Sequence, residues 1–315
     1  MGKSALCALL LVACAVAAAE PPPPWAYPVN PPGVQPPTDD GVPRRVPNSD
    51  AAFTLTRIRD LFDAPDWHPA DHPPMPSIVA HGRRPDVFAC GYCHLPNGLG
   101  RPENASLAGL PAAYIVQQVE DFRSGARRSA EAASLPINLM TAVAKVATTE
   151  EVQAAAAYFA ALAPRKWIHV VETDVVPKTR VGGWMLVAAE GGGTEPIGNR
   201  IIEMPIDLER TELRDSKSAF QALVPVGSLA RGEVLVTTGA GKTTACGVCH
   251  GADLKGLGPV PALAGRSPSY LFRQLFDMKQ GLRHGPWAAL MKPVVAPLSD
   301  EDMVAIAAYA ASREP

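Results

Sequence analysis

The pentapeptides Cys90-Gly-Tyr-Cys93-His94 and Cys246-Gly-Val-Cys249-His250 decide how this chain is interpreted. In an exported protein, Cys-x-x-Cys-His is the pattern of covalent c-type haem attachment. The two thiols of a motif form thioethers to one porphyrin, and the histidine that follows becomes an axial ligand of the iron. The sequence therefore predicts two haem c groups, each with its iron, attached through Cys90, Cys93, Cys246 and Cys249 and ligated by His94 and His250.

Both motifs belong to a longer internal repeat. The shift of 156 residues that superposes His94 on His250 also superposes Leu107-Ala108-Gly109 on Leu263-Ala264-Gly265. Further along, a shift of 151 superposes the two later copies, so the first copy carries five extra residues. We therefore expect two homologous haem domains rather than two isolated motifs.

Each copy is predicted to be mostly helical. Residues 114–124 and 270–280 have amphipathic patterns typical of helices. Gly125 and Gly281 follow them where a left-handed C-terminal cap is favoured.

Three helix starts can be read from capping residues. Thr148-x-x-Glu151 and Ser299-x-x-Asp302 are capping boxes that should open the last helix of each copy. Ser228 is the expected N-cap of a helix over residues 231–238, which leads into the second motif.

Met140 and Met291 are the predicted distal ligands of the two irons. They lie 46 and 41 residues after their histidines, at the same repeat position, in the predicted loop before the last helix. A thioether is a soft ligand that favours reduced iron and raises its potential. A methionine is more often core filler, which is the interpretation for Met278, but repeat equivalence favours ligation at the other two.

The remaining histidines include competing candidates for iron ligands. His284 is the alternative distal ligand of the second haem, although its repeat partner is Arg128. Histidines without repeat partners are expected on the surface or in loops, with His81 a minor candidate beside the first haem; they are His68, His72, His81 and His169.

Support for the proximal imidazole is predicted in the second copy. The stretch Gly258-Pro259-Val260-Pro261 can offer a fixed carbonyl to the imidazole Nδ1–H. The first copy has Pro102 one position out of register, which weakens the case for equal support there. Tyr114 and Tyr270 are expected either to hydrogen-bond near the haems or to fill the core.

The first residues are typical of an export signal, with Lys3, an apolar core over Ala5–Ala19 and small residues before Glu20. Leu11-Val12-Ala13-Cys14 also resembles a lipoprotein box, so a lipid anchor at Cys14 is the alternative. Either interpretation predicts a periplasmic protein. After cleavage at Ala19 the two motifs would use all four remaining cysteines, leaving none for disulfides.

Two segments differ in composition from the repeats. Residues 21–47 hold eleven prolines and favour an extended spacer or a disordered lead-in, followed by a helix within 49–63 that Pro65 ends. Residues 166–225 contain extended patterns and favour an irregular, partly β connector; a separate catalytic module there would lack a convincing residue cluster. The predicted organisation is a signal peptide (1–19), a Pro-rich lead with a short helix (20–64), a first haem domain (65–165), the connector (166–225) and a second haem domain (226–315).

Composition excludes several classes of protein. The formal net charge of −2 argues against nucleic-acid binding or a polybasic membrane surface. No stretch approaches the roughly 20 apolar residues of a membrane-spanning helix.

Taken in order, the haem motif, Gly-Pro-x-Pro-x-Leu-Ala-Gly, the tyrosine-bearing helix, the methionine and the capped last helix resemble the class I cytochrome c fold. The tandem arrangement is similar to bacterial di-haem cytochromes c of the periplasm, over residues 77–163 and 228–313. This resemblance implies a mainly α fold: two class I cytochrome c-like helical haem domains joined by an irregular, partly β connector.

The resemblance implies a periplasmic electron carrier with His/Met haems rather than an enzyme. Its partners would be a dehydrogenase, an oxidase or another cytochrome, and Lys242, Lys255, Lys279 and Lys292 would either contribute to docking or form a solvated face. One alternative is a haem enzyme of the di-haem peroxidase or thiosulfate-oxidising type, which needs an open iron position and acid–base groups. Another is a cytochrome subunit of a dehydrogenase or oxidase complex that docks through the connector.

Overall fold

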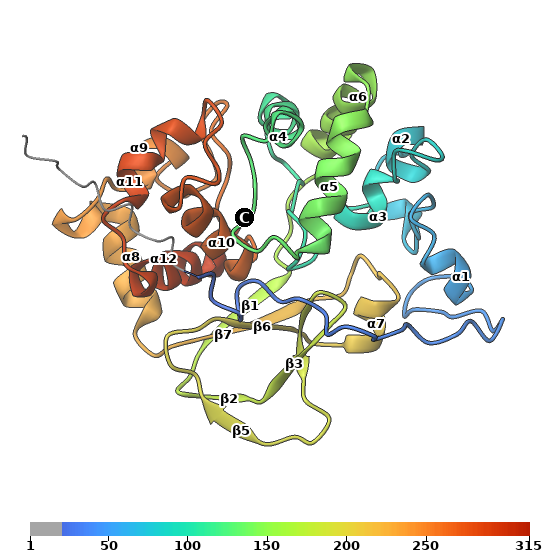
Figure 1. Cartoon of the computed structure of the whole chain (residues 1–315), viewed down its shortest axis with the longest axis horizontal. Coiled ribbons are helices and arrows are strands. Elements are labelled where there is room, and N and C mark those ends of the chain that lie inside the picture. The colour runs from blue at the N-terminus through green and yellow to red at the C-terminus, as the bar shows by residue number, and fades with distance from the viewer. Residues whose placement is uncertain (1–20) are drawn as a thin grey trace, which may run out of the picture.

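A computed structural model describes residues 21–315 and shows helices gathered above a small group of strands (Figure 1). The expected signal peptide, with Cys7 and Cys14, lies outside the described residues. The fold is mainly α with a partly β connector, as the sequence predicts.

The first helical domain contains both predicted helices, α4 and α6, with the unpredicted helix α5 between them. Gly125 closes α4 in left-handed backbone (φ 78°), and the Thr148 capping box opens α6. Both α5 and α6 pack on α4, which places a helical wall opposite the first Cys-x-x-Cys-His motif. The elements are α2 (Ser77–Ala80), α3 (Cys90–His94), α4 (Ala112–Ser124), α5 (Leu135–Val146) and α6 (Thr149–Ala161).

The second helical domain repeats this pattern with more broken helices. The Ser299 capping box opens α12, as predicted. Ser228 is not the N-cap of its helix, because Gly227 takes that position in left-handed backbone (φ 87°) and Ser228 is already helical. The elements are α8 (Ser228–Thr238), η2 (Gly239–Gly241), α9 (Gly247–His250), α10 (Pro268–Lys279), η3 (Ala288–Leu290), α11 (Lys292–Val295) and α12 (Asp300–Ser312).

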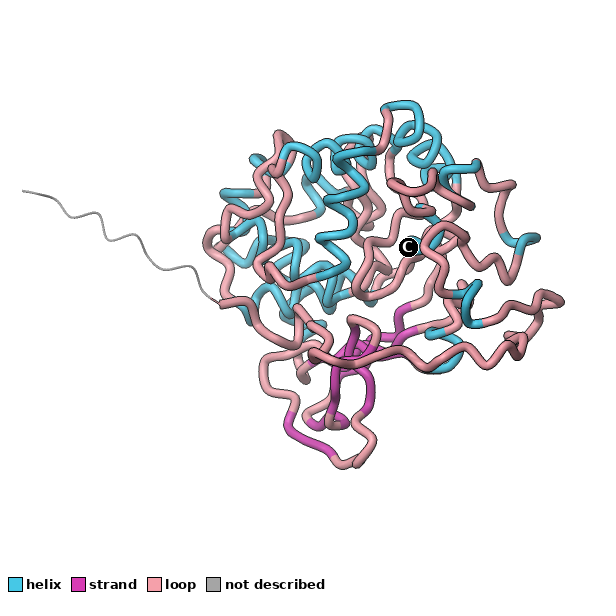
Figure 2. The backbone as a smooth tube through the Cα atoms, turned by 45° about the vertical axis from the view of Figure 1, so that its right-hand side comes forward, coloured by secondary structure: helices cyan, strands magenta, loops and turns pink. Residues whose placement is uncertain are grey.

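The connector forms a three-stranded sheet and two smaller strand pairs (Figure 2). In the larger sheet β1 and β6 flank β7, parallel on one side and antiparallel on the other. The strand β7 and the short helix α7 were not predicted. The elements are β1 (Ile168–Glu172), β2 (Val175–Pro177), β3 (Thr179–Gly182), β4 (Met185–Ala188), β5 (Thr194–Pro196), β6 (Ile202–Pro205), α7 (Leu208–Glu212) and β7 (Phe220–Val224).

The Pro-rich lead is extended but its first residues are packed. Trp25 lies 4.6 Å from the Phe272 ring, centroid to centroid. Tyr27 is buried and donates its hydroxyl proton to the Asp277 carboxylate at 2.8 Å. A spacer without packing was therefore the wrong interpretation for this part, because aromatic side chains between the prolines bury apolar area on the second domain.

Only one turn of the helix predicted within residues 49–63 is present. It forms α1 (Leu55–Ile58), capped by the Thr54 side chain, and a 3-10 turn, η1 (Pro69–Asp71), follows. One continuous hydrophobic core contains residues of the lead, both helical domains and the connector. Burial in a shared core holds these parts together as one unit.

Gly232 sets how closely α8 approaches α12. A Cβ at this position would overlap the carbonyl oxygen of Ala305 and lie 2.6 Å from the Cβ of Tyr309. Gly232→Ala should therefore lower the free energy of unfolding by about 1–3 kcal/mol, because backbone on the facing helix must move.

Denaturant unfolding of the holoprotein measures this effect. Glu233→Ala, on the exposed side of the same helix, is the matched control and should stay within about 0.5 kcal/mol of the wild type. A Gly232→Ala protein as stable as the control would contradict the close crossing.

Candidate functional site

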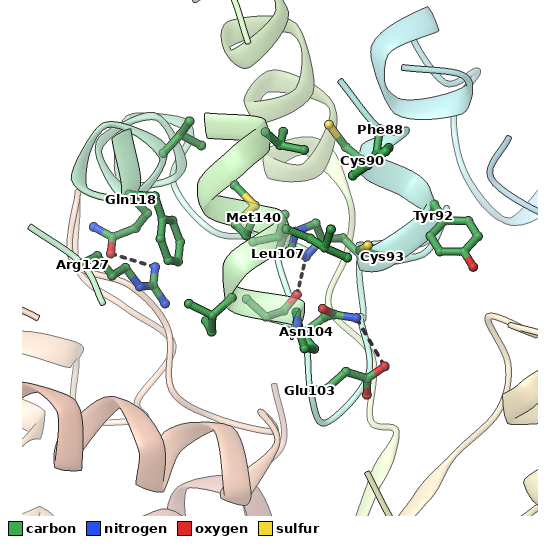
Figure 3. Close-up of a pocket in the computed structure, with 18 of the residues that line it drawn as sticks. Phe88, Cys90, Tyr92, Cys93, Glu103, Asn104, Leu107, Gln118, Arg127 and Met140 are labelled. Carbon is green, nitrogen blue, oxygen red and sulfur yellow. Dashed lines mark hydrogen bonds between the residues drawn. The ribbon is translucent and has the colours of Figure 1, made fainter. Parts of the chain in front are cut away.

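The four residues predicted to hold the first haem line one cavity of about 380 Å³. Cys90 and Cys93 come from α3, as does His94, and Met140 comes from α5 (Figure 3). Apolar side chains such as Leu107 and Phe159 line the same cavity. A cavity of this size with few polar groups is what a flat, mostly apolar ligand requires.

His94 and His250 are held in the same way. The Nδ1–H of His94 donates to the carbonyl of Ala105, and that of His250 to the carbonyl of Pro261, both at 2.8 Å. Burial lowers the pKa of both imidazoles, although these hydrogen bonds oppose the shift. With Nδ1 protonated and the ring neutral, Nε2 keeps its lone pair for a metal.

Ala105 and Pro261 are themselves repeat partners. The predicted carbonyl support in the second copy is therefore present, and the weaker support expected for the first copy was wrong. A backbone carbonyl can accept a hydrogen bond whatever its side chain, so the absence of a proline at this position does not remove the hydrogen bond to His94.

The backbone leaves each motif through left-handed conformation. Leu95 has φ 62° and ψ 153°, and its partner Gly251 has φ 83° and ψ 148°. Leucine rarely adopts this conformation, so burial of the Leu95 side chain must compensate for the strain. The repeat thus conserves the path of the chain where the residue type differs.

Met140 is in the cavity but not in a loop. It lies within the twelve-residue helix α5, so the loop predicted at this position was wrong. Met291 ends η3 and precedes α11, so it lies in the broken segment that the sequence predicted. Met291 and Cys246 are half-buried and pack against the same core, while Cys249 is exposed.

Other histidines have structural partners. His68 was expected near the surface but is buried, with Nε2 at 2.9 Å from the Asp215 carboxylate. His81 is mostly exposed beside Asp63, away from the cavity lining. His284 is exposed, and its backbone N–H donates to the Ala126 carbonyl. Met278 packs against the core, as expected.

A polar cluster between the two domains was missed at the sequence level. Arg127 donates to the hydroxyl of Tyr270 at 2.9 Å, and Arg283 donates to the hydroxyl of Tyr114 at 2.8 Å. These pairs are repeat partners exchanged across the domain boundary, and the two arginines form an antiparallel bridge. The shift of 156 residues also aligns Arg127 with Arg283, which was the available signal.

Positive charge collects at this boundary. Arg127, Arg266 and Arg283 are all buried, and burial lowers the pKa of Arg266 to about 10. Burial alone would raise the pKa of Tyr270, but Arg127 and Arg283 lower it on balance. The Nε of Arg283 is buried and has no hydrogen-bond acceptor among the described residues. A buried guanidinium donor without an acceptor favours the binding of an anion beside it.

The cavity and the cluster together fit a haem. Arg127, Gln118 and Tyr270 line the same cavity as the first Cys-x-x-Cys-His motif, at the side facing the second domain (Figure 3). An apolar space with two thiols and an imidazole at one side and guanidinium groups at another suits a macrocycle that carries carboxylates. Within residues 21–315, no helix is both long and apolar enough to cross a membrane.

This fold and this site define a c-type cytochrome with two class I haem domains. A cytochrome c family model matches residues 230–313. Over 77 residues the chain is 46% identical to cytochrome c-554(548) of Halomonas halodenitrificans, covering 24% of this chain and 93% of that protein. The chain belongs to the cytochrome c family, carries haem c with iron as its cofactor and is an electron-transfer protein.

Two longer matches span both halves of the chain. A thiosulfate dehydrogenase electron acceptor of Stutzerimonas stutzeri is 29% identical over 234 residues, covering 73% of this chain and 82% of that protein. The solved structure of thiosulfate dehydrogenase (TsdBA) from Marichromatium purpuratum matches with a TM-score of 0.50 and 28% identity. That match covers 75% of this chain and 39% of the longer chain.

The exchanged arginine–tyrosine pairs should couple the stabilities of the two domains. Removing either partner of Arg283 and Tyr114 breaks the same hydrogen bond, so Arg283→Met and Tyr114→Phe should show a coupling of about 1 kcal/mol in a double-mutant cycle. Denaturant unfolding of the holoprotein gives the four free energies.

Tyr309→Phe serves as the control partner, because Tyr309 lies in the second domain, stacked under Arg313 rather than against Arg283. Its effect should add to that of Arg283→Met within about 0.5 kcal/mol. Additive effects for Arg283 and Tyr114 as well would show that the hydrogen bond does not join the domains.

Proposed function

We propose that the protein is a di-haem electron carrier with one haem c in each helical domain, within residues 65–165 and 226–315. The observation that carries the proposal is the convergence of the first motif and Met140 on one cavity, with both proximal imidazoles held in the same tautomer. The proposed thioether positions are Cys90, Cys93, Cys246 and Cys249, and the proposed iron ligands are His94, Met140, His250 and Met291.

A bound haem c supplies a reversible one-electron iron couple. The chain sets the conditions for that couple. His94 is buried in a mostly apolar lining, and the neutral imidazole offers Nε2. As iron ligands, the thioethers of Met140 and Met291 would favour the reduced iron, because they are soft. Arg127 and Arg283 would offset the negative charge of carboxylates that a bound haem carries.

The methionine assignment is tested by substitution. Met291→Ala and Met140→Ala should each open one iron to carbon monoxide and lower the potential of one haem, because a soft ligand is lost. Optical spectra and a redox titration of the purified holoprotein measure both effects, with mass spectrometry confirming two attached haem groups.

Met278→Leu is the matched control, because Met278 packs in the core of the second domain. It should leave the spectrum and both potentials unchanged. Native protein that binds carbon monoxide avidly would favour the alternative of a haem enzyme, and an unchanged Met291→Ala spectrum would assign that iron position to another side chain.

We further propose that the donor is a thiosulfate dehydrogenase and that the protein works in the periplasm. The 29% identity to a thiosulfate dehydrogenase electron acceptor over 73% of this chain supports the donor. The match to TsdBA supports it as well, because this chain covers 39% of that thiosulfate dehydrogenase chain and so corresponds to one part of it. Removal of residues 1–19 would release the protein, whereas lipid at Cys14 would tether it.

The donor is tested in a reconstituted assay. Purified thiosulfate dehydrogenase and thiosulfate should reduce both haems of the oxidised holoprotein, seen as growth of the ferrous absorption bands. Thiosulfate without the dehydrogenase should leave the protein oxidised. Reduction by thiosulfate alone would instead indicate an enzyme, and no reduction in the complete mixture would exclude this donor.

A further inference from the structure

Equivalent positions around the two haem motifs differ sharply in exposure. Tyr92 lies inside the first motif and is 6% exposed, whereas its repeat partner Val248 is 68% exposed. Arg101 is 6% exposed, and its partner Leu257 is 61% exposed. Since the two domains share a fold, something outside the repeat must cover the first motif.

The connector provides this cover. The Arg214 guanidinium lies 3.7 Å from the centroid of the Tyr92 ring and donates to the Tyr92 carbonyl at 2.9 Å. Arg101 donates to the Thr211 carbonyl at 3.2 Å, and Asn97 donates to the Ser216 carbonyl at 2.6 Å. Residues 211–216, which include the end of α7 and the chain that follows it, therefore lie directly on the first motif and the residues after it (Figure 1 labels α7).

The cover is held firmly in place. The Asp215 carboxylate is fully buried, 2.9 Å from Nε2 of His68 and 2.7 Å from the Arg210 guanidinium. The Trp67 indole N–H also donates to the Leu213 carbonyl at 2.8 Å. The bonds from Trp67 and His68 join the connector to the start of the first haem domain, so the cover is held by buried contacts rather than being a loop that swings away.

The second motif has an open, mostly apolar surface, which we call the second-motif face. It consists of Val248, Leu257 and Pro259, with Lys242, Lys255 and Asp253 in the flanking chain. Thr243 donates to the Val294 carbonyl at 2.6 Å, which brings the loop before the motif against α11. Exposed Leu290 and Lys292 precede and begin that helix, so lysines border apolar side chains on both sides of the domain.

We propose that the second-motif face is the docking surface for the redox partner. The partner that fits it is a redox protein with an apolar contact area bordered by carboxylates. Lys242 is paired with the Asp302 carboxylate, so Lys255 and Lys292 against Asp253 give the charge complementarity, and the exposed apolar residues give a dry centre. Electrons enter or leave through the second domain, while the connector keeps partners off the first motif. This inference rests on the proposed electron-carrier function.

An electrode can take the place of the unidentified partner. The probe is gold coated with a mixed monolayer of methyl- and carboxylate-terminated alkanethiols, and the measurement is the rate of electron exchange with the holoprotein. Leu257→Glu and Lys255→Glu should each slow this exchange about ten-fold, because both add negative charge on the second-motif face. Raising the salt concentration should also slow the native protein.

Val175→Glu and Lys178→Glu are the matched controls, since both exposed positions lie on or beside β2 of the connector. They should exchange electrons at the native rate. Equal slowing by the controls, native rates for the face variants, or no exchange by the native protein would each overturn the proposed docking surface. A solution titration with small mediators separates the two proposals, because a native protein without a reversible couple there would contradict the carrier function itself.

Discussion

The exchange of hydrogen bonds between Arg127–Tyr270 and Arg283–Tyr114 is the constraint on which the arrangement of the two haem domains depends. Each arginine donates to the tyrosine of the other repeat and also to the glutamine of its own repeat. Burying a guanidinium group is costly when its donors lack acceptors, so the acceptors of the neighbouring domain lower the cost of burying each arginine. The same cluster reaches the first cavity through Arg127 and Tyr270, which ties domain association to the cofactor site.

The connector turns a symmetric repeat into an asymmetric molecule. Two cytochrome domains with one fold would by themselves present two similar faces. Residues 211–216, held by the buried Asp215, cover the first motif, and the second motif keeps its exposed apolar residues. The insertion between the repeats therefore has a physical role that neither repeat supplies: it determines which face a partner can reach.

Local signals in the sequence predicted local structure well. Both capping boxes, the glycine after α4 and the strands around residues 168, 185 and 202 are where their patterns indicate. The predictions were wrong where contacts with distant parts of the chain decide the local conformation or burial. Met140 lies in a helix because α5 packs on α4, and the helix predicted within 49–63 shrinks to one turn. His68 is buried because a carboxylate 147 positions away receives it.

The sequence by itself determined the cofactor chemistry and the family, because Cys-x-x-Cys-His is a local motif and the repeat is a property of order along the chain. It also identified the stretch from Gly258 to Pro261 as a support for His250, since proline restricts its own backbone, and the structure assigned the carbonyl to Pro261. The tertiary structure alone decided that Ala105 gives the same support, that the arginines are exchanged between domains, and that the connector covers one motif only. Those outcomes depend on backbone carbonyls and on contacts between residues more than 100 positions apart, which a local pattern does not encode.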